Sequence, residues 1–152
     1  MAEAKARLSE ELKDALRAGD KVRLAALRLL SASVKNREVE LRRELTDEEF
    51  VEVASREVKR RKEAAEAFEG AGRTELVDRE REEQEVLEAY LPVQLGPEET
   101  EALVAEAIEA TGASGPADLG KVMGYVMGKA RGRVDGGAVN RLARSRLEGM
   151  GA

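Results

Sequence analysis

The chain has 152 residues, 42% of them hydrophobic and 38% charged, a size that suits one medium domain or two small ones. It contains neither cysteine nor histidine, so disulfides, zinc sites built on these residues, catalytic thiols and imidazole bases are excluded. No apolar run approaches the roughly 18 residues of a membrane span, and Met1–Leu12 lacks the apolar run of a signal peptide. We therefore expect a cytoplasmic protein with no cofactor, no metal and no contact with a membrane.

The net charge of −5 is distributed unevenly. Residues 115–152 hold seven Lys or Arg against three acids, which leaves +4 there and −9 on the rest of the chain. A basic tail on an acidic body indicates an anionic partner for the C-terminal region alone. Arginine is commoner than lysine and Asn, Gln and Trp are scarce, a composition typical of a thermophilic or GC-rich source.

Helical periodicity fills the first half of the chain, with helices predicted at about 8–18, 21–44, 46–69 and 73–90. Gly19 ends the first helix, and Thr46 with Glu49 forms a capping box that opens the third. The aromatic content is only 3%, which favours helices packed through Leu, Val and Ala. The expected apolar seam of the third helix is Val51, Ala54, Val58, Ala65 and Phe68.

Prolines divide the chain near its middle. Pro92 and the pair Gly96-Pro97 cannot continue a helix, so we predict domains at 1–92 and 97–149. Three helices follow: one from Pro97 to about residue 111, one from about 116 to 130, and one capped by Asp135 and ended by Gly149. The expected fold is all-α, with an N-terminal bundle of about four helices, some long, and a small C-terminal three-helix domain.

Glycine recurs at every fourth position near the C-terminus, within a segment that otherwise reads as an amphipathic helix. Each helix-interior glycine costs roughly 1 kcal/mol relative to alanine, and this spacing places successive glycines on one face. The missing Cβ atoms allow close approach of either a neighbouring helix or a ligand, and the spacing alone favours neither. The glycines are Gly120, Gly124, Gly128, Gly132 and Gly136.

Basic residues accompany these glycines. Lys121 and Lys129 are suited to neutralising phosphates, and Tyr125 between them is suited to stacking on an exposed base. Arg131 and Arg133 extend the same edge through a glycine-rich turn. The alternative is a solvated helix face with an ordinary half-buried tyrosine. The candidate nucleic-acid-binding residues are Lys121, Tyr125, Lys129, Arg131, Arg133, Arg141 and Arg144.

The other charged runs carry less information. Residues 59–62 (Lys-Arg-Arg-Lys) are flanked by glutamates at helical spacing and are expected to be a solvated face. The carboxylates of residues 82–85 are expected to repel one another on an exposed helix and to form no catalytic site. A second weak anion patch is conceivable from Lys35, Arg37, Arg42 and Arg43, and the Asn140 amide is placed to bond the preceding turn or a ligand.

Five segments together resemble the stand-alone GatB/YqeY family. They are Lys35-Asn36-Arg37-Glu38-Val39, Glu69-Gly70-Ala71-Gly72-Arg73, Tyr90-Leu91-Pro92-Val93-Gln94-Leu95, Asp118-Leu119-Gly120-Lys121-Val122-Met123-Gly124, and Gly132-Arg133-Val134-Asp135-Gly136 followed by Val139-Asn140. The resemblance covers Leu8 to Leu147, and Val134 departs from an expected alanine.

This resemblance implies an all-helical fold whose C-terminal part is similar to the tail domain of GatB, a subunit of a glutamine-dependent aminoacyl-tRNA amidotransferase. In that enzyme the tail contacts tRNA and the chemistry resides elsewhere. The first hypothesis is therefore a non-catalytic tRNA-binding accessory protein. The second is an adaptor for an amidotransferase or synthetase partner. The third is a component with carbon-nitrogen ligase activity and glutamine as amido donor, although the chain lacks a recognisable nucleophile and base. The sequence leaves the oligomeric state open.

Overall fold

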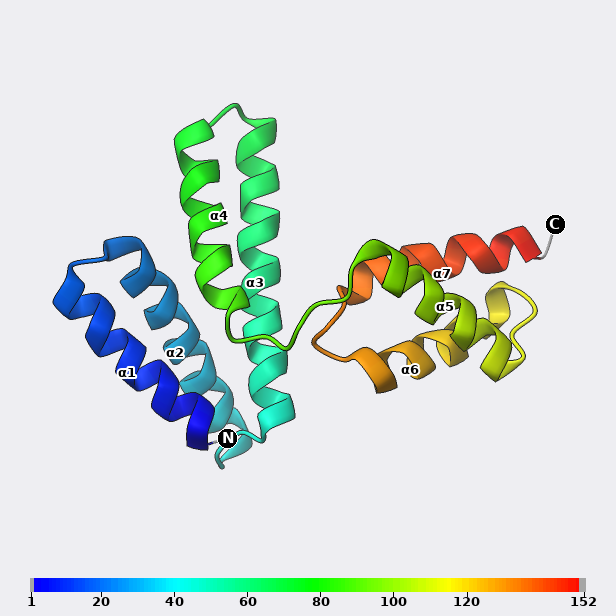
Figure 1. Cartoon of the computed structure of the whole chain (residues 1–152), viewed down its shortest axis with the longest axis horizontal. Helices are drawn as coiled ribbons and strands as arrows, with labels where there is room; N and C mark the ends of the chain where they lie inside the picture. The colour runs from blue at the N-terminus through cyan, green and yellow to red at the C-terminus, as the bar shows by residue number, and fades with distance from the viewer. Residues whose placement is uncertain (1, 151–152) are drawn as a thin grey trace. The chain divides into compact units, whose positions relative to one another are not determined.

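The computed structural model describes residues 2–150, and it is all-α, as the sequence predicts, with no strand in that range. Seven α-helices follow one another through these residues (Figure 1). They are α1 (Ala2–Ala18), α2 (Lys21–Leu41), α3 (Asp47–Gly70), α4 (Thr74–Glu88), α5 (Pro97–Thr111), α6 (Leu119–Ala130) and α7 (Gly136–Met150), with a short 3-10 helix, η1 (Pro116–Asp118), before α6.

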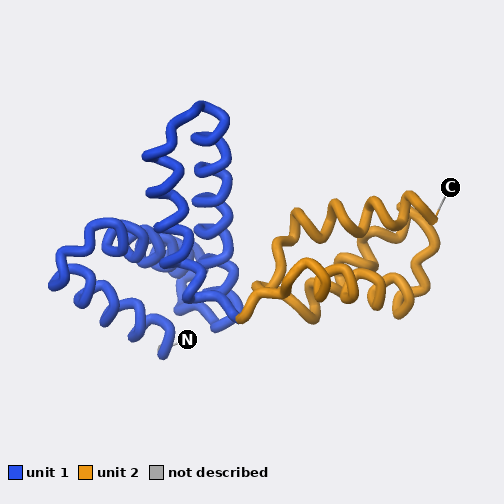
Figure 2. Tube along the Cα trace, turned by 45° about the horizontal axis from the view of Figure 1, so that its top comes forward, with its two compact units in different colours: residues 1–92 blue, residues 93–152 orange. Residues whose placement is uncertain are grey.

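The helices gather into two compact units, Met1–Pro92 and Val93–Ala152, coloured separately in Figure 2. In unit 1, α4 packs against both α2 and α3, and α1 packs against α2. In unit 2, α5, α6 and α7 each contact the other two. Each unit has its own hydrophobic cluster, built mainly from Leu, Val and Ala. The low aromatic content of the chain is thus compatible with two cores because both are helical.

Helix ends follow local backbone chemistry, with three corrections to the predicted ends. Gly19 takes the left-handed conformation (φ 69°) that ends α1. The second helix ends at Leu41 rather than near residue 44, because Arg42 itself adopts a left-handed conformation (φ 57°). The fourth ends at Glu88, short of residue 90. The last continues through Gly149 to Met150.

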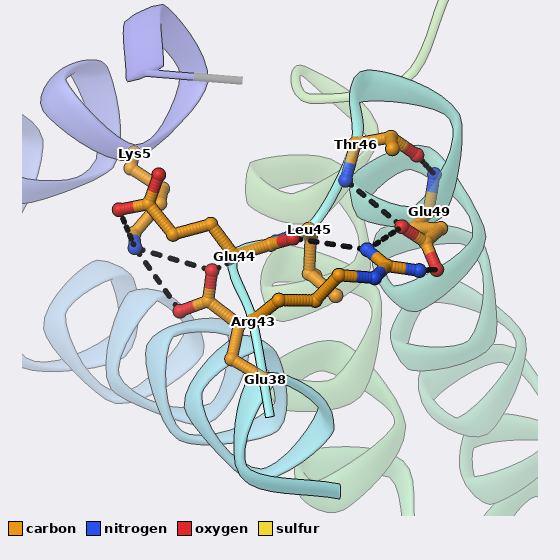
Figure 3. Close-up of polar contacts among 7 residues, drawn as sticks. All are labelled: Lys5, Glu38, Arg43, Glu44, Leu45, Thr46 and Glu49. Carbon is orange, nitrogen blue, oxygen red and sulfur yellow. Dashed lines mark hydrogen bonds and ion pairs between the residues drawn. The ribbon is translucent and has the colours of Figure 1, made fainter. Parts of the chain in front are cut away.

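The partly buried carboxylate of Glu38 holds the connection between α2 and α3 in place (Figure 3). Glu38 of α2 accepts a hydrogen bond from the Leu45 backbone amide at 2.9 Å and one from Lys5 Nζ of α1 at 3.0 Å. The bond from the Leu45 amide and the nearby ammonium lower the pKa of Glu38. One side chain thereby joins α1, α2 and the loop that leads into α3.

The capping box predicted for α3 is present. Thr46 Oγ1 accepts from the Glu49 amide at 3.2 Å, and Glu49 Oε1 accepts from the Thr46 amide at 3.0 Å. Arg43 donates to both oxygens of Glu49, at 2.7 and 3.0 Å. These bonds, from Arg43 first, hold the pKa of Glu49 at about 2. The start of α3 is therefore fixed by a cap that is itself held by a guanidinium fork (Figure 3).

The buried face of α3 is rotated relative to the predicted seam. Val51, Val58 and Phe68 are only half-buried, and Ala54 and Ala65 are buried as expected. Side chains at the positions just before two seam residues, Phe50 and Val53, are buried, and so is Glu57. Glu57 can be buried because Ser33 of α2 and Arg60 each donate a hydrogen bond to its Oε1 at 2.7 Å.

The carboxylates predicted to repel one another on the surface of the fourth helix include one that is buried. Glu83 lies between Arg79 Nε at 3.5 Å and Arg61 Nη1 at 3.7 Å, and its burial raises its pKa. Arg61 also lies 3.3 Å from Glu80. The basic run of residues 59–62 is thus only partly a solvated face, since Arg61 joins α3 to α4.

Replacing Thr46 by Ala is expected to lower the free energy of unfolding of unit 1 by about 1 kcal/mol, because the Glu49 amide loses its acceptor at the start of α3. Urea denaturation followed through NMR signals of α3 measures the change. Thr46→Ser keeps the hydroxyl and serves as the control. An equal loss in both variants would show that the methyl group, rather than the cap, matters.

Candidate nucleic-acid interface

The rotation of α6 is set by its buried side. Val122, Val126 and Ala130 are 0–1% exposed and belong to the inner face of unit 2. Gly120, Gly124 and Gly128, which we call the glycine strip, are exposed. A Cβ atom built on any of the three would meet nothing within 4 Å among the described residues. Tight packing of these glycines against α5 or α7 is therefore not their role within the part of the chain that the structure describes.

The other two glycines of the predicted series do not extend this strip, which corrects the prediction. The sixth helix ends at Ala130, before either of them. Gly132 is buried in the following turn with φ 79°, a conformation that favours glycine. Gly136 begins α7, and its Cβ position lies 3.8 Å from Met127 Cε. The left-handed turn explains Gly132, whereas the contact at Gly136 is an ordinary van der Waals distance that an alanine would also make.

Tyr125 and Lys129 are brought together, and both contact a residue that the sequence did not point to. Glu106 of α5 accepts from the Tyr125 hydroxyl at 2.9 Å and from Lys129 Nζ at 2.9 Å. The Lys129 ammonium also lies 4.9 Å from the centre of the Tyr125 ring. The hydrogen bond of Lys129 with Tyr125, and next in size its hydrogen bond with Glu106, raise the pKa of Lys129. The half-buried ring and the exposed ammonium thus form one group held by the Glu106 carboxylate.

Lys121 stands at the other end of the glycine strip. Its ammonium lies 3.6 Å from Asp118, and its side chain remains 68% exposed. Asp118 accepts mainly from the Ser114 amide at 2.9 Å, which lowers the pKa of this carboxyl. The Ser114 amide uses Oδ2 of Asp118 and Lys121 lies near Oδ1, and this pairing leaves most of the Lys121 side chain open to solvent.

Arg133 has a structural role that the sequence did not indicate. Its Nε donates to the Val93 carbonyl at 2.8 Å, and its own carbonyl accepts from the Leu95 amide at 2.8 Å. Gln94 Nε2 donates to the carbonyl of neighbouring Gly132 at 2.6 Å. The segment leading into α5 is therefore latched onto the turn between α6 and α7. Two of the sequence motifs meet here.

The remaining candidate residues lie on α7 and in the turn before it. Arg131 is exposed in the turn. Arg141 and Arg144 are exposed on the side of α7 that faces away from its buried residues, and neither makes an ion pair within residues 2–150. Asn140 is half-buried beside them. The candidate cations thus lie on two helices, Lys121 and Lys129 on α6, and Arg141 and Arg144 on α7.

Charge is segregated between the helices of unit 2. The fifth helix carries five glutamates and neither Lys nor Arg. Residues 119–150, which hold α6 and α7, carry seven Lys or Arg against two acids. The basic helices α6 and α7 therefore attract an anionic ligand, whereas the acidic helix α5 repels it.

The second anion patch considered from the sequence does not assemble. Arg37 pairs with Glu40 at 2.8 Å, and Arg43 is held by Glu49. Lys35 lines a groove between α1 and α2 together with Lys5 and Leu12 among others, whereas Arg37 lines a different cleft, between α2 and α3. Sequence neighbours on α2 thus point to different surfaces.

None of the described helices is both long enough and apolar enough to cross a bilayer.

The family model for Yqey-like protein matches residues 5–147. The chain belongs to the Yqey-like family. This is the family that the five sequence motifs indicate. A curated relative from Pyrenophora tritici-repentis, named altered inheritance of mitochondria protein 41, mitochondrial, is 31% identical over 130 residues, which are 84% of this chain and 71% of the relative. A relative of the same name from Eremothecium gossypii is 32% identical over 90 residues, 59% of this chain and 49% of that protein.

Replacing Gly124 by Ala is expected to raise the free energy of unfolding of unit 2 by roughly 1 kcal/mol, because the new methyl meets open space and restricts the unfolded chain. Gly132→Ala is the matched contrast. Its φ of 79° makes alanine costly by roughly 1–2 kcal/mol. Urea unfolding followed by NMR signals of α6 measures both. A destabilised Gly124→Ala variant would mean that the strip is packed in solution.

Proposed function

We propose that this chain is a non-catalytic accessory protein that binds tRNA through unit 2. The observation that supports it best is the glycine strip. Its glycines lower the stability of α6 relative to alanine, and no described residue packs against the positions that their Cβ atoms would occupy. Such a strip lets a phosphate or sugar approach the helix backbone closely. Lys121 and the Tyr125–Lys129 group border it with positive charge and an aromatic ring.

The basic groups suit recognition of backbone and shape rather than of base sequence. Single-stranded loops of tRNA offer unstacked bases, which stack on aromatic rings and guanidinium planes. They also offer phosphates, which ammonium groups neutralise. The exposed arginines Arg141 and Arg144 provide further phosphate contacts. Arg133 is assigned to the latch with Val93, so we assign it no direct RNA contact despite its sequence motif.

Glu106 has a defined place in this proposal. It holds Lys129 and Tyr125 in position in the free protein, and its side chain is 52% exposed. Exposed ion pairs contribute little to stability, so a phosphate can replace the carboxylate as the partner of Lys129 at small cost. Glu106 therefore both orders the group and competes with RNA for it.

Exchanging both lysines for glutamate (Lys121→Glu with Lys129→Glu) is expected to lower affinity for bulk tRNA by at least about tenfold. Loss of two phosphate contacts also reduces the slope of log affinity against log salt by about 1.4 to 1.8. Filter binding across a salt series measures both quantities. The control is Lys59→Glu with Lys62→Glu, which makes the same charge change at exposed positions of α3 in unit 1. Equal loss in the two double variants would reject the assigned surface.

Removing the charge of Glu106 (Glu106→Gln) is expected to tighten tRNA binding about two- to fivefold, because Lys129 no longer has a competing carboxylate. Glu109→Gln makes the same change on an exposed residue of the same helix that does not contact Lys129. The same filter assay compares them. Weaker binding by the Glu106 variant would indicate that this carboxylate orders the group more than it competes.

The glycine strip also favours a second candidate, a protein adaptor in which the strip receives a helix of an amidotransferase or synthetase partner. Pulldown with nuclease separates the two functions, since a helix docked through apolar contacts survives nuclease and high salt. We also propose that unit 2 is related to the tail domain of the amidotransferase. We propose further that the chain is a bacterial, cytoplasmic protein with a domain boundary at residues 92–97. Glutamine-dependent ligase activity by the isolated chain is not proposed.

A further inference from the structure

A polar cleft of about 210 Å³ lies in unit 1 between α2 and α3, and none of the residues used above for RNA binding lines it. Ser33, Asn36 and Arg37 line it from α2, and Arg56, Glu57 and Arg60 line it from α3. Both sets recur at three- and four-residue spacing, so each forms one continuous face of its helix. The cleft is thus a product of two regular helices and needs no special loop.

Three arginines, Arg37, Arg56 and Arg60, line this cleft although unit 1 is acidic overall. Arg37 and Arg60 each use Nη1 in one hydrogen bond, to Glu40 at 2.8 Å and to Glu57 at 2.7 Å. An arginine has five N–H donors in a planar fork, so both retain donors for a ligand. Arg56 makes no ion pair within residues 2–150. A free guanidinium beside two anchored ones is an arrangement suited to an anion.

The two carboxylates of the cleft act mainly as supports. Glu57 is 3% exposed, and its Oε1 accepts from both Ser33 and Arg60. A buried carboxylate requires such partners, so it fixes the position of the Arg60 side chain. Glu40, which also lines the cleft but is mostly exposed, pairs with Arg37 at 2.8 Å. With three cations and two anions along its walls, the cleft retains one uncompensated positive charge.

We propose that this cleft binds a phosphate group, through Arg56 together with the free donors of Arg37, Arg60 and the Asn36 amide. The planar guanidinium forks match the oxygen spacing of a phosphate, and a cleft of about 210 Å³ has room for the group and a small attached moiety. The phosphate belongs either to a small phosphorylated molecule or to an RNA backbone. The site does not depend on RNA binding by unit 2.

The test is a titration of the full chain with inorganic phosphate at constant ionic strength, followed by backbone amide NMR. Saturable shifts confined to residues 33–40 and 53–60 are expected. Arg56→Gln should weaken the binding about tenfold, since a hydrogen bond to a charged group is lost. The control is Arg28→Gln, because Arg28 is likewise exposed on a helix of unit 1 and makes no ion pair within residues 2–150.

Shifts that chloride reproduces, or that Arg56→Gln leaves unchanged, would overturn the site. Where phosphate does bind, a short RNA identifies the source of the group. Competition at the same amides indicates a nucleic-acid backbone, and undisturbed phosphate indicates a small phosphorylated ligand. The Lys121→Glu, Lys129→Glu variant should bind phosphate in this cleft as the unaltered chain does, so failure of the tRNA proposal would leave this one standing.

Discussion

The burial of one face of α6 is the constraint on which the candidate interface depends. Val122, Val126 and Ala130 recur at four-residue spacing and are almost completely enclosed. Val122 and Val126 share the core of unit 2 with Val104 of α5 and with Leu147 of α7, among others. Once this face is fixed, every other residue of α6 has a determined direction. The glycines point to solvent, and the lysines and tyrosine follow the edge beside them.

Charge has different roles in the two units. In unit 1, basic side chains pair with carboxylates both within helices and between them. Arg61 joins α3 to Glu80 and Glu83 of α4, and Lys5 joins α1 to Glu38 of α2. In unit 2 the acidic residues gather on α5 and the basic residues on α6 and α7. Paired charges at helix contacts mainly specify structure. Segregated, exposed charges produce a field that salt screens and that a ligand can meet.

The features predicted well from the sequence are those encoded by neighbouring residues. The helices follow from apolar periodicity, the Thr46–Glu49 cap from its three-residue spacing, and the end of α1 from Gly19. The end of α2 was missed because arginine seldom adopts the left-handed conformation that Arg42 takes. No local pattern announces that break.

The missed contacts at the candidate site join residues far apart in the chain. Glu106 precedes Tyr125 by 19 positions and Lys129 by 23, and Arg133 follows Val93 by 40. Such pairs depend on how helices pack, and periodicity within a helix carries no information about them. The burial of Glu83 was missed for the same reason, since its cation Arg61 lies on another helix. The exposure of the glycine strip likewise depends on neighbours in space, which the four-residue spacing does not specify.

The segment from Tyr90 to Leu95 reads as one motif, but its residues serve two different structures. The Tyr90 hydroxyl donates to Glu11 at 2.6 Å, and Arg7 lies 4.4 Å from the centre of the ring, all in unit 1. Gln94 and Leu95 bond instead to the turn that holds Gly132 and Arg133, in unit 2. A substitution at either end of these six residues therefore perturbs a different core. Six consecutive residues thus belong to two structures, so changes at their two ends should affect the stability of different units.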